Sequence, residues 1–162
     1  MFHLADNVYV VGHKSPDTDS VAAAISYANL KNQLGLPDIY IPAAAGVINS
    51  ETKFVLEHFG VPVPETITDG KGKKIILVDH NEVAQAVDNI KEATLMEVVD
   101  HHKIGDIQTG SPIFFHNEPV GSTATIISAM YDQCNVPITK EMAGVMISAI
   151  LSDTVLFKSP TC

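Results

Sequence analysis

The chain has 162 residues, of which 46% are apolar and 18% are charged, a balance that suits one globular domain with a sizeable core. The formal net charge is −9, and all ten basic residues are lysines. A nucleic-acid-binding surface needs clustered basic side chains, so this composition argues against one. The sequence shows no signal peptide and no apolar run long enough to cross a membrane. The two cysteines, Cys134 and Cys162, are too few for a disulfide framework, and we therefore expect a cytoplasmic protein.

Apolar and polar segments alternate along the chain in a way that predicts strands separated by helices. Apolar, β-branched runs predict strands at residues 7–12, 38–43, 74–79, 95–100 and 113–116. Helical spacing, capping residues and glycine or proline stops predict helices at residues 20–34, 49–60, 83–90, 121–135 and 139–152. Such alternation indicates βαβ units, so we expect an α/β fold with a mainly parallel sheet and helices on both faces.

A dense group of polar side chains follows the first predicted strand. The sequence places His13, Asp17 and Asp19 between that strand and the helix that starts near Ser20. In open α/β sheets, ligands bind in the crevice beyond the carboxyl ends of the strands. A single aspartate here would most simply cap the helix. One imidazole together with two carboxylates favours the binding of divalent cations instead.

Two further predicted strands end in the same residue types. Asp79 ends one of them, and Asp100 ends another and is followed by His101 and His102. Taken alone, Asp79 would indicate an Asx turn or a helix cap, and the histidines a hydrogen-bonded polar pair at the end of a strand. Parallel strands, however, bring their carboxyl ends to one edge of a sheet. We therefore expect these groups to converge, and Asp153, just after the last predicted helix, can join them.

Five ordered motifs carry a resemblance to a known family. Their order is that of the DHH phosphoesterase superfamily, and they are similar to those of the family II, manganese-dependent inorganic pyrophosphatases over essentially the whole chain. The resemblance implies that residues 1–162 form a single DHH metal-binding domain of an enzyme that hydrolyses inorganic pyrophosphate to two phosphates. The motifs are His13–Ser20, Val78–Glu82, Asp100–Lys103, Gly121–Thr125 and Ser152–Thr161.

The resemblance also implies a site for two Mn²⁺ ions, with Co²⁺ or Mg²⁺ as substitutes. Asp79 and Asp153 would be shared between the two ions, which makes Asp79 a catalytic residue as well as a ligand. Four carboxylates would neutralise two divalent charges, and mixed oxygen and imidazole ligands suit Mn²⁺. The implied ligands are His13, Asp17, Asp19, Asp79, His101 and Asp153.

The remaining roles follow from the same resemblance. His13 and Asp17 would serve one ion, and Asp19 and His101 the other. His102 is implied to be catalytic, by contacting phosphate or by donating a proton.

Several neighbouring residues are expected to support these ligands. Asp100 and His80 are expected to orient the imidazoles. The segment 121–123 either packs a helix N-terminus against the site or simply caps that helix, and both alternatives stay open.

The sequence departs from the family in its cationic residues. Family members carry a second, C-terminal domain whose basic motif grips pyrophosphate, and residue 162 falls where the linker to it would begin. The chain has no arginine, and the lysines beside its motifs are Lys14, Lys103 and Lys158. We therefore expect a chain that binds metal but is weak or inactive alone. Because relatives dimerise through this domain, we also expect a homodimer.

Two alternatives remain beside the pyrophosphatase. One is another DHH-type enzyme, a phosphodiesterase that cleaves short oligonucleotides or an exopolyphosphatase. The other is a metal-binding or dimerisation module without activity. Phosphate release from pyrophosphate, polyphosphate and a dinucleotide would separate the three.

Overall fold

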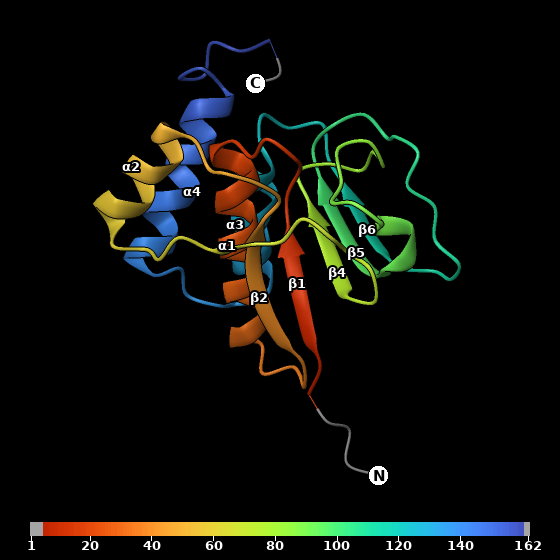
Figure 1. Ribbon diagram of the computed structural model, residues 1–162. Coiled ribbons are helices and arrows are strands. Elements are labelled where there is room, and N and C mark those ends of the chain that lie inside the picture. Colours follow the sequence, from red (N-terminus) through yellow and green to blue (C-terminus); the bar gives the residue numbers. More distant parts are fainter. Residues whose placement is uncertain (1–4, 161–162) are drawn as a thin grey trace.

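A single parallel sheet organises the computed structural model, which describes residues 5–160 (Figure 1). The strand order is β3-β2-β1-β4-β5-β6, and every neighbouring pair is parallel. The expected α/β fold with a parallel sheet is therefore confirmed. The strands are β1 (Asn7–Val11), β2 (Ile39–Ala44), β3 (Glu65–Thr66), β4 (Lys74–Val78), β5 (Thr94–Asp100) and β6 (Phe114–Asn117).

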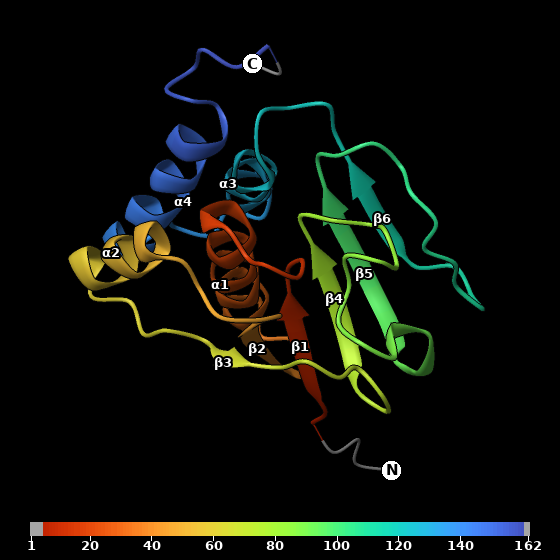
Figure 2. The same ribbon diagram turned by 45° about the horizontal axis from the view of Figure 1, so that its top comes forward.

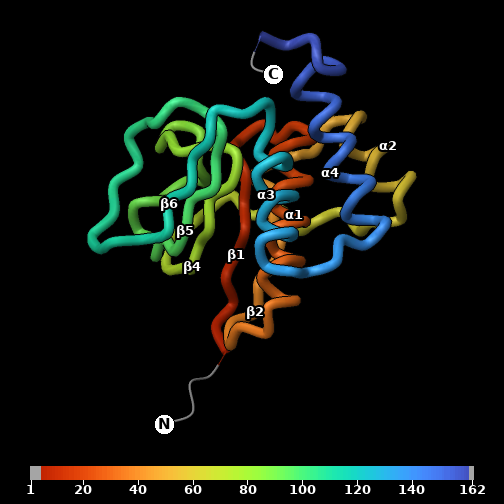
Figure 3. The backbone as a smooth tube through the Cα atoms, turned by 180° about the vertical axis from the view of Figure 1, so that it is seen from behind, coloured from red at the N-terminus to blue at the C-terminus, as the bar shows by residue number. Residues whose placement is uncertain are grey.

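Four α-helices begin at the capping residues that the sequence suggests. Asp17, Asn49, Ser122 and Thr139 each accept a hydrogen bond from a backbone N–H in the first turn of their helix, which satisfies a donor that has no partner within the helix. The helix α1 lies beside both α3 and α4 (Figure 3). The helices are α1 (Thr18–Gln33), α2 (Ser50–Phe59), α3 (Thr123–Gln133) and α4 (Lys140–Asp153), with a short 3₁₀ helix, η1 (Ile90–Glu92).

The two faces of the sheet are covered differently (Figure 2). Successive side chains of a strand point to opposite faces, so Val10 packs with the residues of all four α-helices in one core cluster. Its neighbour Val11 packs on the other face with Ala86, Val87 and Ile90 of the loop and η1 after β4. The second face is thus covered by η1 and connecting loops rather than by long helices.

The prediction of a helix at residues 83–90 is wrong. The segment forms turns and a bridge, and only η1 at its end is helical. Asn89 adopts a left-handed backbone with φ of 56°. The Asp88 N–H donates to the backbone oxygen of Thr68, and the Gln85 oxygen accepts from the N–H of Lys14, so neither group is available for a helical bond. Contacts with distant segments therefore override the local helical spacing.

The carboxyl ends of β1, β4 and β5 lie next to one another in the middle of the sheet. At the first of these ends, Gly12 lies so close to α1 that an added Cβ would collide with the Ser20 hydroxyl and approach its backbone oxygen. Glycine thus allows α1 to start directly above the strand edge. Within residues 5–160, no helix is both long and apolar enough to span a bilayer.

Candidate metal centre

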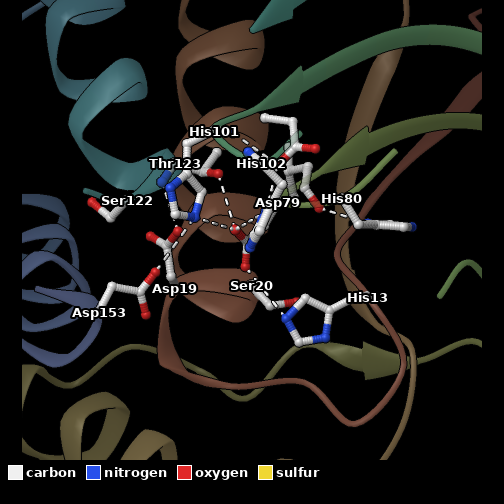
Figure 4. Close-up of polar contacts among 12 residues, drawn as sticks. His13, Asp19, Ser20, Asp79, His80, His101, His102, Ser122, Thr123 and Asp153 are labelled. Carbon is white, nitrogen blue, oxygen red and sulfur yellow. Dashed lines mark hydrogen bonds and ion pairs between the residues drawn. The ribbon is translucent and has the colours of Figure 1, made fainter. Parts of the chain in front are cut away.

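The six predicted ligands converge at the carboxyl edge of the sheet, where Figure 4 shows most of them. They come from the loop after β1, the first turn of α1, the ends of β4 and β5, and the last residue of α4. Within each of three groups, all ligand atoms lie within 4.8 Å of one another, and Asp79 belongs to all three. Two groups consist of predicted ligands alone: His13, Asp17 and Asp79, and Asp19, Asp79, His101 and Asp153. The third group is Asp79, His101 and His102.

The first group is built around the His13 imidazole. Its Nδ1 donates to the backbone oxygen of Lys14 at 2.7 Å, which leaves Nε2 as the lone-pair nitrogen of a neutral ring. That Nε2 lies 3.4 Å from a carboxylate oxygen of Asp17 and 3.4 Å from one of Asp79. The other oxygen of Asp17 caps α1 by accepting from the Ser20 N–H. Asp17 therefore does both things that its position allowed, because one oxygen caps the helix and the other faces His13.

The second group repeats this arrangement around His101. The Nδ1 of His101 donates to the backbone oxygen of Val120 at 2.8 Å, and its Nε2 lies 3.3 Å from Asp79 and 3.7 Å from Asp153. This Nε2 is buried, and among the described residues it makes no hydrogen bond of good geometry. A neutral imidazole would thus point a lone pair at carboxylates. A cation placed between them would satisfy both, and metal-bound histidines usually donate their other nitrogen in this way.

Asp19 is held by the N-terminus of α3. Its two carboxylate oxygens accept from the backbone N–H groups of Thr123 and Ala124, at 2.6 and 2.9 Å. Ser122 caps the same helix through the N–H of Thr125. The Gly121–Thr123 segment therefore serves both purposes left open above: it caps α3 and packs the N-terminus of α3 against the site.

Asp79 is the most enclosed member of the cluster after Asp19, with 1% of its surface exposed. It leaves β4 in a left-handed conformation with φ of 62°, which aspartate tolerates better than most residues. The hydroxyl of Thr123 donates to its Oδ1 at 3.1 Å. This turn at the end of the strand places the Asp79 carboxylate between the two imidazoles.

His102 lies at the open side of the site, about half exposed. Its Nδ1 contacts the buried Asp100 carboxylate at 2.8 Å, and Asp100 also accepts from the side-chain nitrogen of Asn81. The hydrogen bond that His102 donates to Asp100 raises the pKa of His102, although burial lowers it. The expected orienting role of Asp100 thus has a geometric basis. Asn81 also contacts the loop at Lys103. It lies within the Val78–Glu82 motif, but its supporting role is not evident from the sequence.

His80 points away from the cluster (Figure 4). Its Nδ1 bonds the backbone oxygen of Val78, and its ring lies edge-on to that of His13, with centroids 6.3 Å apart. Burial lowers the pKa of His80, which favours the neutral ring. His80 therefore supports the His13 ring through packing, and its other nitrogen is buried without a partner in the described part of the chain.

Electrostatics in the cluster are dominated by buried carboxylates. Burial, and then the charges of Asp79 and Asp153, raise the pKa of Asp19, although the α3 backbone donors lower it. Burial, and then the charges of Asp79 and Asp17, raise the pKa of Asp153 to about 7. Without bound cations, protons would occupy part of this cluster.

The imidazoles compensate for some of this negative charge. Burial lowers the pKa of His13, but hydrogen bonds to Asp17 and Asp79 outweigh it and raise the pKa to about 11. Burial is likewise outweighed at His101, where Asp79 raises the pKa to about 8. Burial would raise the pKa of Asp79, yet its two histidine neighbours hold that pKa well below its usual range.

Lysines contribute little to this edge of the sheet. Lys14 is paired with Asp88 at 2.7 Å and Lys103 with Glu82 at 3.0 Å. Lys158 is exposed beyond the end of α4. Thr161 and Cys162, the end of the fifth motif and one of the two cysteines, lie outside the described residues.

The fold and this cluster define an α/β domain with a candidate centre for two divalent cations. Four carboxylates match the charge of two such ions, and the paired imidazoles present their free nitrogens to the carboxylates. Oxygen and nitrogen donors of this kind suit Mn²⁺. Asp153 joins only one of the two groups, so its sharing between both ions stays a prediction.

Comparison with known proteins identifies the family. Residues 7–150 match the N-terminal domain of the DHH family, and the chain belongs to that family. It is 70% identical, over 98% of its length, to a manganese-dependent inorganic pyrophosphatase of Methanothrix thermoacetophila, of which it covers 51%. The resemblance that the motifs carry is therefore confirmed, and the chain spans about half the length of the curated relatives it matches.

Solved structures agree with the fold. A Methanococcus jannaschii protein provisionally assigned as a family II inorganic pyrophosphatase has a TM-score of 0.87 and 48% identity, over 95% of this chain and 51% of that one. An exopolyphosphatase-related protein from Bacteroides fragilis has a TM-score of 0.71 over 94% of this chain and 47% of that one. Its identity is 18%, so it supports the fold alone.

The raised pKa values predict how the metal-free protein responds to pH. Asp153 titrates at about 7 when folded against 3.8 ordinarily, and His101 at about 8 against 6.5. A raised folded-state pKa gives stability that is present at low pH and is lost as the pH rises between the two values. In EDTA, the melting temperature should therefore fall from pH 5.5 to 8.5. Asp153→Asn should flatten the lower half of that fall, and a melting temperature that rises over this range would contradict the assignment.

Proposed function

We propose that the chain is the metal-binding half of a manganese-dependent inorganic pyrophosphatase, which hydrolyses pyrophosphate to two phosphates. One observation carries the proposal: two ligand groups share Asp79, and each contains an imidazole whose free nitrogen faces carboxylates. The name of the Methanothrix thermoacetophila relative supports the same reaction and metal.

His13, Asp17 and Asp79 would hold one Mn²⁺, with Co²⁺ or Mg²⁺ as substitutes, in this proposal. Asp79 would also contribute to the second site. A pair of such ions, when bound, lowers the pKa of a shared water and offsets the charge that develops on the phosphoryl oxygens. The second group is completed by Asp19, His101 and Asp153.

The chain's own residues shape this chemistry in three ways. The N-terminus of α3 fixes Asp19 by two backbone hydrogen bonds, so that carboxylate needs no reorientation to act. The Nδ1 bonds of His13 and His101 fix the ring orientations and the tautomers. The Asp79 side chain is buried, so bulk water does not screen its carboxylate, and each charge interaction with it is stronger.

His102 would handle a proton or contact phosphate. Its Nδ1 is held by Asp100, so Nε2 is the nitrogen left for substrate. The hydrogen bond to Asp100 raises the pKa of His102 and so favours its protonated form relative to a free histidine, and a protonated ring can donate to a phosphate or leaving oxygen. Its partial exposure at the open side of the site is consistent with contact to an incoming anion.

The same reasoning predicts that these 162 residues alone are only weakly active. Pyrophosphate needs cationic groups on its second phosphate, and Lys14 and Lys103 are already paired with carboxylates. No arginine is present to supply a bidentate contact. We further propose that the protein acts in the cytoplasm, a compartment consistent with the free, exposed thiol of Cys134.

The first test of the metal proposal is thermal. A Mn²⁺ concentration 100-fold above Kd should stabilise the fold by about 2.7 kcal/mol, because only the native state presents the assembled ligands. Asp79→Asn keeps a residue that tolerates the left-handed backbone but removes the shared charge, so it should abolish most of the shift. Asp132→Asn, on the exposed side of α3, serves as the control. An equal Mn²⁺ shift in all three proteins would exclude Asp79 as a shared ligand.

The second test is of the reaction itself. With saturating Mn²⁺, the chain should release phosphate from pyrophosphate in preference to polyphosphate or a dinucleotide. Its rate should be at least about 100-fold below that of the Methanothrix thermoacetophila relative, the scale for losing one preorganised charge contact. Preferred dinucleotide cleavage would instead favour a DHH phosphodiesterase, preferred polyphosphate cleavage an exopolyphosphatase, and Mn²⁺ binding without turnover an inactive module. Equal rates would contradict the proposal that this chain binds the metals while a further domain binds the second phosphate.

We also propose a homodimer formed through β6. This strand pairs with β5 alone within residues 5–160, and it exposes Phe114 and Phe115, at 49% and 39%. An open apolar edge readily pairs with another strand. Sedimentation should give a dimer that Phe114→Lys weakens, whereas Phe54→Lys on the exposed side of α2 should leave it intact. A wild-type monomer at tens of micromolar would exclude the dimer.

A further inference from the structure

The Glu51 carboxylate lies outside the metal cluster and links α1 and α4, two helices that carry candidate metal ligands. Oε1 of Glu51, in the first turn of α2, accepts from the Thr18 hydroxyl at 2.5 Å and from the Ser152 hydroxyl at 2.7 Å. Thr18 is in the first turn of α1, and Ser152 is in the last turn of α4. We call these three residues the Glu51 clip. The clip joins segments 33 and 101 residues away from Glu51 in the sequence.

The clip lies directly beside candidate ligands on both sides. Thr18 stands between Asp17 and Asp19, and Ser152 immediately precedes Asp153. The two hydroxyl-bearing residues are therefore direct neighbours in the chain of three of the four candidate carboxylate ligands. Neither hydroxyl contact is needed to cap α2, because the side chain of Asn49 already does that.

The end of α4 needs such a restraint. The C-terminus of a helix carries partial negative charge, which disfavours a carboxylate there. Asp153 occupies that position, and Asp79 and Asp17 repel it as well. These repulsions favour a displacement of the last turn of α4 away from the cluster, and the attraction of Asp153 to His101 opposes it. Ser152, bonded to Glu51, opposes that movement.

We propose that Glu51 is a positioning residue, which holds the last turn of α4 against the first turn of α1 so that Asp153 and Asp19 together face His101. The inference rests on the proposed metal site and deepens it. Glu51 touches none of the six candidate ligands in the described contacts, so it acts through Thr18 and Ser152. Sequence motifs do not reveal it, because both partners are distant in the chain.

Direct Mn²⁺ titration tests this, with the electron paramagnetic resonance signal of free Mn²⁺ as the readout. The wild-type chain should bind two equivalents. Glu51→Ala should weaken one equivalent by about 10- to 100-fold, the usual loss when a group that orients a ligand is removed. Glu51→Gln should retain most of the affinity, because the amide oxygen can still accept both hydroxyl bonds while the charge is gone.

Two further variants separate positioning from charge and from general destabilisation. Glu57→Ala, on the exposed surface of the same helix, removes an equal charge and should leave both equivalents unchanged. Ser152→Ala should weaken the same equivalent as Glu51→Ala, and the double variant should be no weaker than Glu51→Ala, because one interaction cannot be lost twice.

The outcomes distinguish this inference from the proposed function. A wild-type chain that binds no Mn²⁺ overturns both. Two wild-type equivalents with unchanged binding in Glu51→Ala overturn the positioning role alone. Glu51→Gln as weak as Glu51→Ala would do the same, because the effect would then come from charge rather than from the accepted hydrogen bonds.

Discussion

The burial of like charges is the constraint on which this domain depends. Asp19 and Asp79 have 0% and 1% of their surface exposed, yet their carboxylates belong to one cluster with Asp153. Unpaired ionised groups in such a place would be strongly unfavourable. Backbone N–H groups at Asp19 and imidazoles at Asp79 offset part of this negative charge. The remaining carboxylate and imidazole groups could coordinate cations. The features that make the site unfavourable without ligand are also those that would favour divalent cations.

Helix ends are the means by which the fold places these charges. The N-terminal turn of α1 supplies Asp19 and is capped by Asp17, the N-terminus of α3 donates to Asp19, and the C-terminus of α4 supplies Asp153. The first two place carboxylates at partly positive ends, where they are favoured. The third places the Asp153 carboxylate at the partly negative C-terminus of α4, and this is the helix end that the Glu51 clip restrains. A site built on rigid helix ends keeps its ligand spacing because the helices pack as bodies on a parallel sheet.

How much the sequence predicts depends on how local the cause is. Strand ends and caps such as Asp17 follow from neighbouring residues, and parallel strand order then brings Asp79 and His101 together. The helix predicted at 83–90 fails because the backbone groups of Gln85 and Asp88 bond distant segments. The sequence does not reveal Glu51 or the role of Asn81 for the same reason, since their partners are set by tertiary structure. Motifs therefore locate the charged cluster, and the structure reveals what holds it in place.

The place of β1 in the sheet has a consequence for synthesis on the ribosome. β1 precedes both β2 and β4 in the sequence, yet it lies between them in the sheet, and α1 packs against α3 and α4, which follow much later in the sequence. A nascent chain can pair β1 on one side once β2 emerges, but its other edge waits for β4. The apolar surface of α1 waits longer still, until α4 has left the exit tunnel. Throughout that interval the chain presents an open strand edge and an uncovered helix, the surfaces that chaperones shield from aggregation.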